Sequence, residues 1–230
     1  MNYRQEIDGL RAIAVLSVIL YHAGFSFFKG GFLGVDVFFV ISGFLMTSII
    51  LKEKEGGSFS IKIFCARRVR RIFPMLIFTI ISSFIVGLFI LLPVELINFS
   101  RTALTAVLGI SNIYFAKNLG SYFATSSDFL PLIHTWTLGV EEQFYIILPV
   151  LFILFGKFGK RNVFLIIFTL CFISFGLNFI LQNQIYNFYL LHTRFWELGI
   201  GCLTAFFGNR AKPSNLLSLL GLIAICISII

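Results

Sequence analysis

The stretch LRAIAVLSVILYHAGFSFFKGGFLGVDVFFVISGFL, residues 10–45, decides the fold of this chain. It consists of two apolar runs joined by a short turn at 29–31, and each run is about long enough to cross a bilayer as a helix. His22 lies in the first run and Asp36 in the second. Because an ionisable side chain inside a membrane helix is costly, such a residue is usually functional. The pair therefore predicts a site.

The spacing of His22 and Asp36 indicates that they meet. His22 precedes Lys29 by seven residues, and Asp36 follows Lys29 by seven. On antiparallel helices the two side chains are therefore expected at similar depth in the membrane. Arg11 shares a helix face with His22, roughly 16 Å away along the axis. A carboxylate placed in this way can orient an imidazole and raise its basicity, as in acyl-transfer triads. Alternatively, the two side chains are separate interhelical hydrogen-bond partners that hold a bundle together.

The composition indicates a polytopic membrane protein. Of the 230 residues, 58% are hydrophobic and 12% are charged, and the mean hydropathy is +0.97. A soluble domain is about a quarter charged, so this chain lacks the polar residues for a water-facing exterior. The net charge of +8 does not require a nucleic-acid partner, because Lys and Arg concentrate in the cytoplasmic loops of membrane proteins. The four cysteines show no metal-ligand spacing, so we predict neither a disulfide nor a metal site.

Apolar runs predict an all-α transmembrane helix bundle with about seven spans. The runs cover residues 12–28, 32–51, 74–92, 143–156, 162–181, 190–208 and 215–230. A weaker segment, 102–117, is more polar. If it stays at the outer interface without spanning, the 18 basic residues divide 14 to 4 in favour of the cytoplasmic side, as the positive-inside rule requires. We therefore expect a cytoplasmic N-terminus, with the histidine and aspartate in the outer half of the membrane.

The segment FCARRVRRIFP, residues 64–74, is strongly basic. Its arginines are Arg67, Arg68, Arg70 and Arg71. They are expected at the end of a cytoplasmic loop, 52–73, with Pro74 in the first turn of the membrane helix that follows. Arg67 would share a helix face with Arg70 and Arg71, so that several guanidiniums converge on one phosphate. The alternative is an orientation signal that contacts anionic lipid headgroups.

Two further segments, HTWTLGVEEQFYIILP at 134–149 and FWELGIG at 195–201, bring charges to the expected outer boundary. Together with the residue before the second segment, they supply Trp136, Glu141, Glu142, Arg194 and Glu197. The adjacent glutamates point about 100° apart, so one of them is expected to face the bundle. The alternatives to a functional site are that Trp136 is an aromatic-belt anchor and that Arg194 forms only a local i, i+3 salt bridge with Glu197. The convergence of so many ionisable groups favours a site.

Taken together, DGLRAIAVLSVILYH, GVDVFFVISGFL, ARRVRRIFP and HTWTLGVEEQFY resemble the motifs of membrane acyltransferase family 3, from about residue 3 to the end. The resemblance implies a ten-helix membrane core, of which about seven helices are present. Residues 1–230 would then be an acyltransferase membrane domain that is incomplete at its C-terminus. The last run ends without a polar anchor, which also suggests a fragment. We expect residues 1–230 to lack the SGNH-type hydrolase-like domain that is found in some members.

The resemblance also implies a reaction. Members O-acylate cell-surface polysaccharides and related acceptors, taking the acyl group, commonly acetyl, from acyl-coenzyme A on the cytosolic side. We expect a multi-pass protein of a bacterial-type inner membrane, with no tightly bound cofactor and an extracytoplasmic polysaccharide or glycolipid as acceptor. The catalytic candidates are His22 as general base, Asp36 and Glu142. The substrate-binding candidates are Arg11, Arg67, Arg68, Arg70, Arg71, Glu141, Trp136, Arg194 and Glu197.

A proton-coupled transporter is the alternative from another class of protein. Intramembrane His, Asp and Glu side chains also form proton relays, and Gly199, Gly201 and Gly208 would permit the helix breaks that transporters use. No inverted internal repeat is detectable, which disfavours this alternative. A non-catalytic scaffold would leave the Arg-x10-His spacing and the clustered acids unexplained. Formation of an acylated product would separate transfer from transport.

Overall fold

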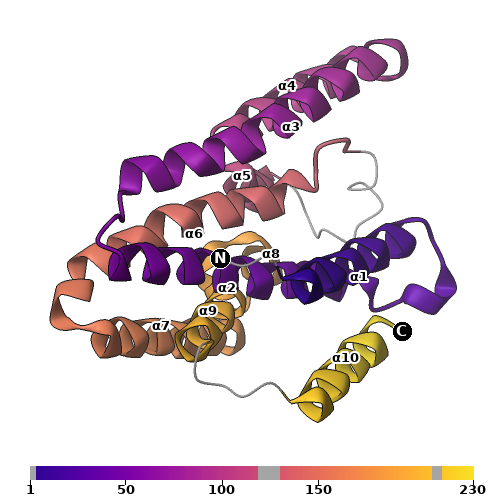
Figure 1. Ribbon diagram of the computed structural model, residues 1–230. Helices are drawn as coiled ribbons and strands as arrows, with labels where there is room; N and C mark the ends of the chain where they lie inside the picture. The colour runs from indigo at the N-terminus through magenta and orange to yellow at the C-terminus, as the bar shows by residue number, and fades with distance from the viewer. Residues whose placement is uncertain (1–3, 119–129, 209–213) are drawn as a thin grey trace.

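The computed structural model describes residues 4–118, 130–208 and 214–230, and within these ranges the chain forms helices and no strand (Figure 1). The all-α prediction is therefore confirmed. The α-helices are α1 (Gln5–His22), α2 (Gly34–Glu55), α3 (Ile61–Ile90), α4 (Pro93–Val107), α5 (Ser111–Asn118), α6 (Thr135–Leu154), α7 (Lys160–Ile180), α8 (Gln184–Tyr189), α9 (Leu191–Phe207) and α10 (Asn215–Ile229). Short 3-10 turns at Ser26–Phe28, Gly31–Leu33 and Gly156–Phe158 complete the described elements.

Four of the described helices are long and apolar enough to cross a bilayer. They are α2 with the turn before it, α3, α6 and α7. The shorter helices α1, α9 and α10 have 18, 17 and 15 residues, so the number of seven spans stays a prediction. Large apolar side chains face outward on α3, where Phe89 is 86% exposed. Such a surface suits lipid rather than water, because lipid solvates apolar side chains at no cost.

Helix α3 begins much earlier than the sequence pattern indicated. The expected cytoplasmic loop 52–73 is wrong: α2 continues to Glu55, and α3 starts at Ile61, so the four arginines lie on a helix. Pro74 is in the interior of α3 instead of its first turn. Residues 61–73 contain no glycine or proline, and six of the 13 are the good helix formers Lys, Ala and Arg, which is compatible with the early start. Pro74 removes one backbone N–H from the helix ladder, leaving the Arg70 carbonyl without that donor.

The weak segment 102–117 is divided between two helices, neither of which is long enough to span. Helix α4 ends at Val107, and α5 starts at Ser111 after a turn at Gly109, whose φ of +68° suits glycine. In Figure 1, α4 runs antiparallel beside α3 along one edge of the bundle, and α5 turns inward toward α6. The segment thus consists of two helical pieces joined by a turn, and its position outside the membrane stays a prediction.

The bundle core is centred on α2, α6, α7 and α9, and α2 packs most extensively against α9. Two glycines make this approach possible. A Cβ atom at Gly43 would lie 1.8 Å from the Leu198 carbonyl oxygen, and one at Gly201 would lie 1.9 Å from that of Val40. Small residues at such positions let helix backbones meet closely in membranes. We call this contact the α2–α9 seam, and it positions the ionisable residues described next.

Candidate functional site

A cavity of about 130 Å³ lies where the end of α1 meets the starts of α2, α6 and α9. It is lined by His22, Phe32, Val35, Asp36, Trp136, Phe188 and Arg194. Four residues that the sequence singled out therefore share one small space, although they come from four helices. We call this space the histidine cavity.

The His22 ring is held in one orientation at the last residue of α1. Its Nδ1 donates a hydrogen bond to the Val18 carbonyl oxygen over 2.8 Å, and the edge of its ring packs against Tyr21. A carbonyl oxygen can only accept, so Nδ1 holds a proton. In the neutral imidazole, Nε2 then carries the lone pair and is the atom that can accept a proton.

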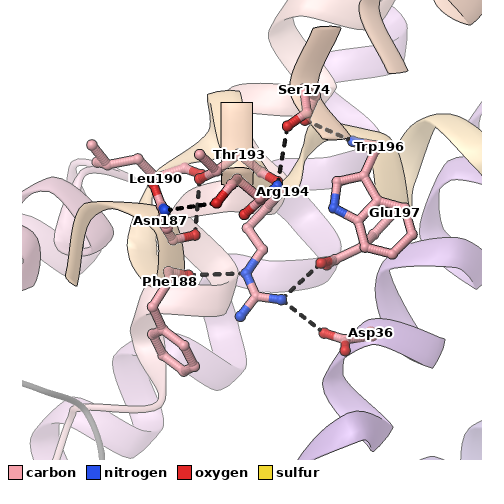
Figure 2. Close-up of polar contacts among 10 residues, drawn as sticks. Asp36, Ser174, Asn187, Phe188, Leu190, Thr193, Arg194, Trp196 and Glu197 are labelled. Atoms are coloured by element: carbon pink, nitrogen blue, oxygen red, sulfur yellow. Dashed lines mark hydrogen bonds and ion pairs between the residues drawn. The ribbon is translucent and has the colours of Figure 1, made fainter. Parts of the chain in front are cut away.

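Arg194 joins several helices at the wall of the histidine cavity (Figure 2). Its Nη1 donates to Asp36 on α2 over 3.1 Å and to Glu197 over 2.7 Å, and its Nε donates to the Phe188 carbonyl oxygen over 3.0 Å. The guanidinium also lies over the Trp136 and Phe188 rings, 5.7 Å and 5.0 Å from their centroids. The Arg194–Glu197 pair is thus part of an interhelical network as well as a local salt bridge.

The network joins two carboxyl groups to one guanidinium. The Glu197 side chain is only 2% exposed, and its second oxygen, Oε2, has no hydrogen-bond partner among the described residues. A buried carboxylate of this kind is expensive without compensation, so Glu197 depends on Arg194. Asp36 lines the histidine cavity, whereas Glu197 is not among the described residues of its wall.

Glu141 belongs to a second polar cluster farther along α6. Ser42 donates to Glu141 Oε1 over 2.5 Å, and the Tyr145 hydroxyl donates to Oε2 over 2.9 Å. The charges of Arg11 and Arg71 are close enough to act on this carboxylate. Because α6 starts at Thr135, both glutamates lie well inside the helix rather than at its mouth. Ser42 follows Asp36 by six residues, so this cluster lies roughly 9 Å from the histidine cavity along α2.

The arginines of α3 face this second cluster. Arg68 lies over the Phe64 ring, 5.8 Å from its centroid, and interacts electrostatically with Tyr145. Arg67 forms an ion pair of 2.6 Å with Glu53 of α2. Arg70 and Arg71 are exposed. The four arginines therefore lie on a helix and not in a free loop, and Arg67 and Arg68 contact neighbouring side chains.

Glu142 lies apart from the histidine cavity. It is not among the described residues that line the cavity, and its Oε2 packs against Gly109, where a Cβ atom would lie 2.2 Å away. Arg11, the other partner in the Arg-x10-His spacing, is 3.7 Å from Asp8 and close to Glu141. The structure thus divides the predicted outer cluster into two sites along the bundle.

His134 precedes α6 and faces a groove of about 290 Å³ between α3 and α6, which Arg71 also lines. The residue is exposed there, and the surrounding helices remove part of the hydration of its ring. This desolvation lowers the pKa of His134, and the nearby charge of His22 lowers it further. Within the described ranges, no group of three His, Cys, Asp or Glu side chains could hold a metal ion.

The sequence pattern missed several partners of the site. Tyr145 follows Glu141 by four residues, so the helical period could have placed both on one face. Ser42 and the Phe188 carbonyl carry no such signal, because they reach the site through tertiary packing. The same holds for Asn112, whose amide hydrogen-bonds with Gln143 and the Tyr189 carbonyl in the core.

Comparison with known proteins identifies the class. Residues 4–230 match the acyltransferase domain family, and the chain belongs to that family. The resemblance noted in the sequence is thereby confirmed.

The chain is 36% identical over 211 residues to the O-acetyltransferase OatA of Staphylococcus aureus (strain NCTC 8325 / PS 47), a match that covers 89% of this chain and 35% of that protein. It is 37% identical over 226 residues to the "Putative O-acetyltransferase SAS0844" of Staphylococcus aureus (strain MSSA476), covering 94% of this chain and 36% of that protein. The chain thus spans about a third of the length of these relatives. No solved structure matches it significantly.

Proposed function

We propose that this chain carries out O-acyl transfer, moving an acyl group from acyl-coenzyme A to a hydroxyl of a cell-surface carbohydrate. The observation that carries the proposal is the fixed imidazole of His22 at the histidine cavity, whose Nδ1–H bond to Val18 puts the lone pair of the neutral ring on Nε2. Membership of the acyltransferase domain family and the names of the O-acetyltransferase relatives support the same reaction.

In this mechanism His22 is the general base. Nε2 takes the proton of the acceptor hydroxyl as its oxygen attacks the carbonyl carbon of the thioester. The carbon–sulfur bond then breaks, the acyl group stays on the acceptor oxygen, and the proton passes from Nε2 to the departing thiolate. The reaction thus needs no other reactant, and the histidine returns to its starting state.

The Arg194 network supplies fixed charge to this step. Asp36 lines the cavity, and its carboxylate would stabilise the imidazolium that forms as His22 takes the proton. Because three hydrogen bonds hold Arg194, these charges are already oriented before the substrates bind. Asp36 thereby acts through Arg194 as a positioning residue.

The size of the histidine cavity supports a short acyl group. Its volume is about 130 Å³. A cavity of about 150 Å³ holds a molecule the size of benzene, so this one is large enough for the acetyl end of a thioester but too small for a sugar ring together with a long acyl chain. We therefore infer an acetyl donor, with the acceptor sugar remaining outside the cavity and presenting only its hydroxyl.

The arginines of α3 suit the phosphates of the donor. In the proposed orientation the N-terminus is cytoplasmic in a bacterial-type inner membrane, and the nucleotide enters beside Arg68 and Arg71. Tyr145, next to Arg68, is nine residues from Trp136 on α6, which is roughly 14 Å along the helix axis. The extended arm of acyl-coenzyme A would cover this distance and bring its thioester to the histidine cavity.

The test is transfer of labelled acetyl groups from acetyl-coenzyme A to envelope polymers by membranes that contain the full-length protein. His22→Ala should lower transfer at least about 100-fold at matched protein levels, because general base catalysis contributes about that much. His192→Ala is the matched control, since His192 is exposed on α9 and should retain wild-type transfer. Equal transfer by the wild type and His22→Ala would refute the role of His22. Solute movement without an acylated product would favour the transporter.

A further inference from the structure

A second and larger cavity lies at the opposite end of the same helices. Its volume is about 950 Å³, and it opens between the end of α2, the start of α7 and the end of α9. Lys52 in its wall follows Asp36 by 16 residues on α2, so the two cavities are separated by roughly 24 Å. Ligand sites in proteins commonly enclose about 300–1,000 Å³, which places this cavity at the upper end of that range.

The charge of this cavity is strongly positive. Arg4, Lys52, Lys160 and Arg161 line it, whereas Glu55 is the only acidic residue among the described residues of its wall. Lys160 forms an ion pair with Glu55, and Arg4 forms one with Glu6, so Lys52 and Arg161 supply an excess of two positive charges at the cavity. Residues Lys160 and Arg161 also form the first turn of α7, where backbone N–H groups add to the positive potential.

The remaining wall of the cavity is aromatic. Phe44, Phe164, Phe206 and Phe207 line it. The Phe164 ring meets those of Phe206 and Phe207 edge to face, with both centroid distances 5.6 Å, and the Arg4 guanidinium lies 5.6 Å from the centroid of Phe44. Cations therefore surround a hollow with an apolar aromatic side. Charges that serve only to orient a membrane protein would not need such a hollow.

We infer that this basic aromatic cavity binds a ligand that joins a phosphate group to an apolar or aromatic part. Ammonium and guanidinium groups bind phosphate through charge-assisted hydrogen bonds, and phenylalanine rings pack against a flat base or an acyl chain. Two sources share this chemistry: a soluble adenine nucleotide, bound here in addition to any donor at the α3 arginines, and an anionic phospholipid. The site is distinct from the α3 arginines, and it does not rest on the proposed reaction.

The experiment compares two double variants of the full-length protein in detergent. Lys52→Ala with Arg161→Ala removes two cations from the cavity wall. Lys62→Ala with Lys157→Ala removes two exposed cations that are not among the described residues of that wall. Both pairs lower the net charge by two, and all four side chains are exposed, so both variants should fold. A thermal unfolding scan checks this before binding is measured.

Two probes distinguish the sources of phosphate. Calorimetry measures the affinity for adenosine 3′,5′-bisphosphate, and native mass spectrometry measures retention of phosphatidylglycerol against phosphatidylcholine. The cavity variant should lose affinity for one probe by about tenfold or more, because each charge-assisted contact contributes about 1.5–3 kcal/mol, while the control stays near wild type. The probe that responds identifies the source. The inference is overturned if the wild type binds neither probe, or if both variants respond equally.

Discussion

Removing the Arg194 side chain should strongly destabilise the protein. The guanidinium is 16% exposed and donates to Asp36, Glu197 and the Phe188 carbonyl oxygen. Arg194→Ala would leave the Glu197 carboxylate, which is 2% exposed, without its cation. Taking one partner from a buried ion pair costs about 3–5 kcal/mol, because the remaining charge stays buried. Most of this cost comes from Glu197, since Asp36 is 30% exposed and can gain solvent.

The measurement is thermal unfolding of the purified protein in detergent. For a protein of this size each kcal/mol lowers Tm by about 2–4 °C, so Arg194→Ala should unfold about 10 °C below wild type. Arg101→Ala, which removes an exposed arginine on α4, is the control and should unfold within about 1 °C of wild type.

A second variant tests the cause of this loss. Adding Glu197→Gln to Arg194→Ala removes the unpaired buried charge, so the double variant should recover part of the lost Tm. If Arg194→Ala unfolds together with the control, the network does not stabilise the bundle and the reasoning is refuted. If the double variant is even less stable than Arg194→Ala, the cost lies in lost packing instead of unpaired charge.

Three further predictions follow from other parts of the structure. Gly201→Leu would push a side chain into the Val40 carbonyl, so the variant should express poorly or unfold at least about 10 °C below wild type. A wild-type Tm would refute the close approach of α2 and α9 at the α2–α9 seam. Tyr145→Phe would remove one hydrogen bond to buried Glu141 and should cost about 1–3 kcal/mol in urea unfolding; an unchanged midpoint would show that the bond does not contribute. The pKa of His134 is lowered in the folded protein, so its stabilising contribution is complete above about pH 6.5 and is lost as the pH falls through the lower folded value. His134→Gln should therefore show a flatter dependence of Tm on pH between about 5 and 7, whereas identical pH profiles would contradict this reading.

The sequence predicted the parts of the site that depend on local helix geometry. His22 and Asp36 do line one cavity, as their equal spacing from Lys29 predicted. The expected helix to residue 28 and short turn at 29–31 are wrong, because α1 ends at His22 and residues 23–33 form the connection, with two 3-10 turns. The i, i+3 relation brought Arg194 and Glu197 together, and this relation follows from the helical period alone.

The features that were wrong or missed depend on packing and register between distant helices. The onset of α3 could not be read from hydropathy, because arginine is a good helix former but is strongly polar. The division of the acidic residues into two clusters depends on how α6 is positioned against α2. The contact between these helices joins Glu141 to Ser42, which is 99 positions away in the sequence. No local pattern determines such a pairing.

The α2–α9 seam has a consequence for how substrates could enter. Asp36 lies on one helix of the seam and Arg194 on the other, and the glycine contacts leave no room for these helices to slide. The counter-charges of the histidine cavity therefore sit on a single stiff unit, and little energy is spent on reorienting dipoles as the proton moves. In the proposed reaction, donor and acceptor would reach the histidine cavity by movement of α1 or α3, which carry His22 and the arginines, against this unit.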